Sequence, residues 1–263
     1  MKKRIPITFP TFESIWNFDP YFLKRLQTRL KESASKKLNE KVELWAETGL
    51  GELSLSIATK SQIIPLVVRR LEDDWKDLEA HFLKKESKVA SLEDKTAYRD
   101  PDLSLEAIIK IITDFDSVIF ESKSLIDYII RFLCVFYKEI LDTPLNKKEA
   151  FELVGSLFDS PQGEPFSDDT FFTDETGWEN PLWTQILKEL RDEFIHEKAT
   201  WLELFYDSTA SKKFQPCFLR SQDRNEEVVT IDDINAVMNG LSQLSQRIET
   251  HLKEKIAEFE VGN

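Results

Sequence analysis

Residues that break regular structure are few in this 263-residue sequence, which has seven glycines and ten prolines. An all-β fold with many tight turns would need more of both, so the shortage favours long regular elements. Cysteine is scarcer still, with two copies. Cys134 and Cys217 lie far apart in apolar contexts, which excludes a disulfide framework and a cysteine pair for metal and suits a reducing, cytoplasmic compartment.

Several motifs that carry enzyme chemistry are also missing. The chain has no glycine-rich phosphate loop of the GxGxxG or GxxxxGK[ST] kind and no GxSxG nucleophile turn. The three histidines, His81, His196 and His251, are too far apart in sequence to predict a zinc site. The segment 159–181 is acidic but lacks the glycine and terminal glutamate of a calcium loop, so we interpret it as a solvated loop. The sequence therefore predicts no cofactor and no metal.

Long apolar runs are absent as well. The longest, at 128–137, is short and interrupted by Arg131, and the basic N-terminus meets prolines and acids before any signal-peptide core forms. We therefore expect neither a membrane span nor a signal peptide. The formal net charge is -13. Such a surface repels phosphate backbones, so any RNA-binding site must be local.

Apolar residues at three-to-four spacing are plentiful, and this spacing is typical of amphipathic helices. It predicts helices over 19–34, 65–89, 104–141, 147–158, 182–206 and 231–259. Pro65 suits a first helical turn, and Ser104 suits a helix cap. Residues 51–58 alternate like a short strand, although a helix continuing beyond residue 60 is the alternative. We predict an all-α fold, a helical bundle of long antiparallel helices, and leave open one small β-hairpin near 214–231.

A polar stretch at 91–102 contains Pro101 and is typical of a linker. It divides the chain into an N-terminal helical region of unknown role, 1–98, and a helical bundle, 99–263. A single packed domain is the alternative.

One motif has a counterpart in a known family. The predicted late helix contains the stretch LKELRDEFIHEKATW and carries Arg191, Asp192 and His196. An all-helical bundle with Arg, a polar residue and then His resembles the HEPN superfamily, whose signature is R-x(4–6)-H. Asp192 takes the polar position, where the family often has Asn. The resemblance covers about 102–260, and the helix at 104–141 looks like the family's other core helix, which often carries an acid, through Asp114, Asp116 and Glu121.

The resemblance implies a metal-independent endoribonuclease that acts as a homodimer on an RNA substrate. Arg191 would hold phosphate oxygens, His196 would transfer protons, and Asp192, four residues before it, would orient the imidazole. Five residues along a helix turn through about 500°, or about 140° beyond a full turn, so Arg191 and His196 do not share a face. They would converge around a cleft, most simply one shared with a second subunit.

The alternative is a non-catalytic helical module that binds a protein partner or a small ligand. The segment 182–206 contains three positively charged and five negatively charged side chains, and such an excess of negative charge disfavours binding to RNA. In this interpretation Arg191 pairs with Glu193 or a neighbouring carboxylate, and His196 caps a buried hydrogen bond. A local positive hollow around Arg191 would favour the nuclease, and an apolar or acidic groove would favour the module.

Overall fold

The computed structural model describes residues 16–33, 35–84, 96–98, 102–158, 201–206, 214–219 and 228–262. These residues are mostly helical and fall into two compact units. The first unit holds the described residues of 65–120 and 181–237, and the second holds those of 15–64, 121–180 and 238–263. Each unit takes segments from both sides of residue 98, so the units divide the chain differently from the predicted regions 1–98 and 99–263.

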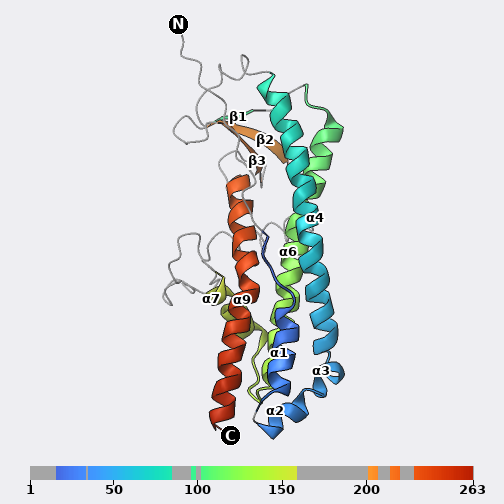
Figure 1. The fold of residues 1–263 in the computed structure, drawn as a ribbon. Coiled ribbons are helices and arrows are strands. Elements are labelled where there is room, and N and C mark those ends of the chain that lie inside the picture. The colour runs from blue at the N-terminus through green and yellow to red at the C-terminus, as the bar shows by residue number, and fades with distance from the viewer. Residues whose placement is uncertain are drawn as a thin grey trace. The chain divides into compact units, whose positions relative to one another are not determined.

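Three long helices dominate the described residues (Figure 1). They are α4 (Leu50–Leu83), α6 (Leu105–Glu139) and α9 (Ile231–Gly262). The shorter helices are α1 (Phe22–Lys31), α2 (Lys36–Lys41), α3 (Leu44–Glu47) and α7 (Lys147–Leu157). The helices predicted over 19–34, 104–141, 147–158 and 231–259 are confirmed, with bounds that differ by a few residues. No helix in the described residues is both long and apolar enough to cross a membrane.

Polar side chains begin two of these helices. Ser104 Oγ accepts a hydrogen bond of 3.1 Å from the backbone N–H of Ala107 at the start of α6, as its predicted capping role requires. At the start of α7, Asn146 accepts bonds from two backbone N–H groups, and Glu149 accepts one from the Asn146 N–H in return. This reciprocal capping satisfies donors that have no partner inside the helix.

Helix α4 corrects two predictions. It is one helix of 34 residues, so 51–58 is helical rather than a strand, and Pro65 lies inside the helix rather than in its first turn. The strand prediction was wrong because the alternation does not match burial: Ile57 is fully buried whereas Leu55 is exposed. The buried positions follow a helical period instead, through Leu50, Ile57, Ile64, Leu71 and Leu78.

The second unit is built around apolar side chains of α6 and α9. Phe132 and Phe136 of α6 are buried, and both make edge contacts with Trp45 of α3. Helix α9 buries one side chain every three or four residues: Leu241, Leu244, Ile248, Leu252 and Ile256. Phe158, which follows α7, packs directly against Gly240, where a Cβ would collide with its ring. Burial of this size is the main stabilising contribution to the unit.

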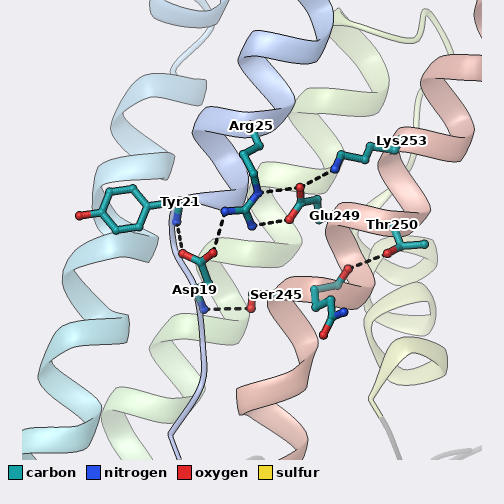
Figure 2. A network of polar contacts seen from close by, with 8 residues as sticks. Asp19, Tyr21, Arg25, Ser245, Glu249, Thr250 and Lys253 are labelled. Carbon is teal, nitrogen blue, oxygen red and sulfur yellow. Dashed lines mark hydrogen bonds and ion pairs between the residues drawn. The ribbon is translucent and has the colours of Figure 1, made fainter.

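An extended segment before α1 is tied to α9 by polar groups. The N–H groups of Asn17 and Asp19 donate to the hydroxyls of Ser242 and Ser245, at 3.2 and 3.0 Å. Figure 2 shows the continuation of this network, in which Arg25 lies between Asp19 and Glu249. The Arg25 guanidinium donates a hydrogen bond of 2.7 Å to Asp19 and one of 2.8 Å to Glu249. Its third nitrogen pairs with the other carboxylate oxygen of Glu249. Arg25 thereby links α1 to α9.

A small antiparallel sheet belongs to the first unit. Its strand order is β1 (Thr96–Tyr98), β2 (Trp201–Tyr206), β3 (Phe214–Leu219) and β4 (Val228–Thr230). Strands β3 and β4 pair in antiparallel fashion, with Phe218 opposite Val229. Both lie in the segment 214–231, near which the sequence leaves open a small hairpin. The prediction of a helix over 182–206 is wrong for its last six residues, because 201–206 form strand β2. Strand β1 lies within the predicted linker 91–102.

Candidate functional site

The residues predicted to carry chemistry lie outside the described part of the chain. Arg191, Asp192 and His196 all fall between 159 and 200, and so does the acidic loop 159–181. The predicted ribonuclease site therefore stays a prediction. Of the helix on which it was placed, 182–206, only the last six residues are described, and they form β2.

The three acids of α6 to which the resemblance drew attention have different surroundings. Glu121 pairs with Lys60 of α4 at 2.6 Å in the second unit. Asp114 pairs with Arg70 of α4 at 2.9 Å in the first unit. Asp116 is half-buried, its Oδ1 has no hydrogen-bond partner, and burial raises the pKa of its carboxyl to about 6. The Asp116 carboxyl can therefore change protonation near neutral pH.

A cluster of charged side chains lies between α4 and α6 in the first unit. Asp74 of α4 is buried, with 5% of its surface exposed, and its Oδ1 accepts a hydrogen bond from Lys110 of α6. That bond is the main reason why the pKa of Lys110 is raised. Asp74 also interacts with the carboxyl of Asp114, whose pKa is raised by burial and, less strongly, by this neighbour, while Arg70 opposes the rise.

The same two helices border a cavity of about 350 Å³. Its wall includes Asp74, Asp77, Leu78, His81, Asp102, Leu103, Ser104, Ala107, Lys110 and Ile111. Residues 74–81 come from α4, and residues 102–111 come from the start of α6 and the turn before it. At this volume the cavity is at the small end of ligand pockets. All of its lining residues belong to the first unit, so the cavity can be assessed as a candidate site.

The wall has distinct apolar and polar parts. Leu78, Leu103, Ala107 and Ile111 supply the apolar part. Three carboxylates, one ammonium group and His81 supply most of the polar part, which therefore carries more negative than positive charge. No group of three or more histidine, cysteine, aspartate or glutamate side chains within the described ranges is arranged to hold a metal ion.

The second unit contains a tyrosine–histidine pair that links α6 to α9. Tyr137 Oη lies 2.6 Å from His251 Nε2, and the two rings are stacked. Burial raises the pKa of Tyr137 to about 12 and lowers the pKa of His251. The hydroxyl therefore stays protonated and the imidazole neutral at pH 7, so the two groups share a hydrogen bond whose direction is set by the imidazole tautomer, an arrangement that stabilises packing rather than activating a nucleophile.

The sequence carries a signal for the buried acids in their position on apolar helix faces. Asp74 falls between Leu71 and Leu78, at the three-to-four spacing of the buried face of α4, and Asp114 precedes the buried Phe115 on α6. A carboxylate on a buried face is costly unless it is paired, so it indicates a partner or a ligand.

Comparisons of the chain with protein-family models, with curated proteins and with solved structures give no match. The cavity and the predicted site are therefore interpreted from their own residues.

Proposed function

We propose that this chain is a HEPN-like, metal-independent endoribonuclease that works as a homodimer. The observation that carries the proposal is the R-x4-H motif formed by Arg191 and His196, with Asp192 in the polar position after the arginine. The long helices α6 and α9, which flank the motif in sequence, support the helical-bundle context of the motif. The half-buried carboxyl of Asp116 on α6 supports the match to an acid-bearing core helix.

The motif supplies the groups that RNA cleavage by an internal hydroxyl needs. The ribose 2′ oxygen attacks the neighbouring phosphorus, a base accepts the proton of that hydroxyl, and an acid protonates the departing 5′ oxygen. A neutral imidazole is a suitable base and an imidazolium a suitable acid near pH 7. One His196 from each of two chains would provide both forms. Arg191 would neutralise the charge that develops on the phosphate oxygens and would hold two of them at once.

The test is cleavage of structured and unstructured RNA by the purified full chain in the presence of EDTA. We expect cleavage by the wild type, and a loss of about 10²- to 10⁴-fold in rate for His196→Ala, because a general acid or base is removed. Arg191→Lys is also expected to impair cleavage, since lysine keeps the charge but loses the two-pronged contact with phosphate. His81→Ala and Arg69→Lys are matched controls on α4 and should retain the wild-type rate.

Two results would contradict the proposal. One is cleavage that both motif variants retain, which would mean a different site or a contaminating nuclease. The other is the absence of cleavage of every RNA tested by a folded, dimeric preparation. The second result would favour the alternative function, a helical module that binds a protein partner or a small ligand, with Arg191 in a structural ion pair.

A further inference from the structure

The cavity between α4 and the start of α6 offers two kinds of surface to a ligand. Leu78, Leu103, Ala107 and Ile111 form an apolar wall, whereas Asp74, Asp77 and Asp102 line the cavity with carboxylates. A ligand that covers both kinds must carry a short hydrocarbon part beside a group that pairs with carboxylates.

The charges of the lining residues favour a cation. Lys110 is bound to Asp74, and its side chain is 64% exposed, so it reaches the buried carboxylate from the surface. Asp77 is exposed and makes no hydrogen bond or ion pair within the described part of the chain. On the α4 side of the cavity, Asp74 and Asp77 supply two carboxylates, against the single ammonium group of Lys110 on α6, so these three residues carry an excess of negative charge. An anion would be repelled at such a wall.

A second observation points to a missing donor. Asp74 is buried and lines the cavity, yet its Oδ2 has no hydrogen-bond partner. A buried carboxylate oxygen without a donor is costly, and the neighbouring carboxyl of Asp114, whose pKa is raised by burial and less strongly by the charge of Asp74 and a hydrogen bond with it, can offer a donor only while it is protonated. The exposed Lys110 compensates only one of the two Asp74 oxygens.

We propose that this cavity binds a primary alkylammonium group, with the methylenes against the apolar wall and the ammonium against Asp74 and Asp77. An ammonium has three N–H donors and can bond to more than one carboxylate. Bare metal ions fit less well because much of the wall is apolar and the described acids form no coordinating group of three. The site does not rest on the proposed ribonuclease activity, because it uses none of the motif residues.

The ammonium can come from a free diamine or from a lysine side chain of another protein, and the test separates the two. Calorimetric titration of the full chain would use 1,4-diaminobutane as one probe and a blocked peptide with a central lysine as the other. We expect saturable binding of at least one probe. Neutral 1,4-butanediol and the acetyl-lysine form of the peptide should not bind, since neither has the charge.

The decisive variants lie on α4. Asp77→Asn should weaken binding about fivefold and Asp74→Asn about tenfold or more, as expected for the loss of charge-assisted hydrogen bonds. Asp73→Asn is the matched control: Asp73 is exposed on the same helix and does not line the cavity, so affinity should stay within about twofold of wild type. Asp77 is exposed and unpaired within the described residues, so its variant is expected to fold even where Asp74→Asn does not.

Three results would overturn the proposal. They are the absence of saturable binding for both probes, equal weakening by Asp73→Asn and Asp77→Asn, or binding of butanediol as tight as that of the diamine. Equal weakening would mean that the chain of net charge -13 attracts cations diffusely. None of these results bears on RNA cleavage by His196, so the two proposals fail separately.

Discussion

The indole nitrogen of Trp16 donates a hydrogen bond of 2.9 Å to the backbone carbonyl of Ser61. Ser61 lies four residues before Pro65, and proline has no N–H to offer to that carbonyl. The side chain of an extended N-terminal segment therefore provides the donor that the proline lacks. The contact thus satisfies the carbonyl that Pro65 leaves without its helical donor, within a helix that continues on both sides of the proline.

The Trp16–Ser61 bond predicts a specific non-additive effect on stability. Trp16→Phe should lower the free energy of unfolding by about 1–3 kcal/mol, because it leaves a carbonyl without a donor and removes ring contacts. In a Pro65→Ala background, the alanine N–H can bond to Ser61, so the same change should cost about 1 kcal/mol less. Urea unfolding of the four proteins of this double-mutant cycle measures the difference. Equal costs in both backgrounds would disprove the role of the bond.

How far the sequence predicts the fold depends on whether a pattern is long enough to be unambiguous. Helix α9 buries residues at three-to-four spacing from Ile231 to Ile256, and no strand has that period, so the prediction was correct. The alternation at 51–58 is only eight residues long and gave the wrong element. Trp201 and Phe205 are four residues apart, a spacing that fits both one helix face and one strand face, so they were assigned to a helix although they lie on β2.

The candidate site was less accessible to prediction than the fold. Asp74 and Lys110 are 36 positions apart and come together only because α4 and α6 pack side by side. The sequence placed Pro65 in a first helical turn, where proline is most common. Its position inside α4 leaves the Ser61 carbonyl to accept from Trp16, which is 45 positions away. Pairings of this kind depend on tertiary contacts that local periodicity does not contain.

Glu249 should make the stability of the second unit depend on acid pH. Its pKa is lowered, chiefly by the hydrogen bonds from Arg25, so its ionised form stabilises the fold. This stabilisation is present above the unfolded-state pKa and is lost as the pH falls through the lower folded-state value. Glu249→Gln should therefore cost about 1 kcal/mol at pH 7, and the difference from wild type should shrink below about pH 4. Unfolding at several pH values, with the exposed Glu254→Gln as control, measures this difference.

His251 should add a second pH dependence nearer neutrality. Burial lowers the pKa of His251, so the folded state favours the neutral ring that is hydrogen-bonded to Tyr137. The stabilisation is complete above the unfolded-state pKa of about 6.5 and falls as the pH drops through the folded-state value. The wild type should lose melting temperature between about pH 7 and 5, and His251→Gln, which does not titrate there, should lose less. An identical fall in both proteins would contradict the assignment.

The proposed ribonuclease requires two chains, because one His196 supplies only half of an acid–base pair. Sedimentation of the full chain at micromolar concentration should show a dimer of twice 30.7 kDa. Cleavage should then fall on dilution, since monomers form by mass action. A cleaving species that sediments only as a monomer would remove the two-subunit site and leave the helical fold unaffected.

Asp116 should oppose the stability of the first unit at neutral pH. Its carboxyl has a pKa of about 6 because of burial, and its Oδ1 has no hydrogen-bond partner. For an acid whose folded-state pKa is raised, the stabilisation is present below the unfolded-state pKa of about 4 and is lost as the pH rises through 6. Asp116→Asn cannot ionise, so it should be more stable than wild type by about 1 kcal/mol at pH 8, once solvent screening of this half-buried group is allowed for.

The gain from Asp116→Asn should disappear at about pH 4, where the wild-type carboxyl is mostly protonated. The matched control is Asp127→Asn on the same helix, because the Asp127 carboxylate is paired with Lys123 at 2.6 Å. That variant should lose rather than gain stability at pH 8, because it removes half of an ion pair. Natural chains keep a costly buried acid where activity needs it. If Asp116 belongs to the proposed ribonuclease, the asparagine variant should therefore be more stable and cleave RNA more slowly, and unchanged cleavage would separate Asp116 from that site.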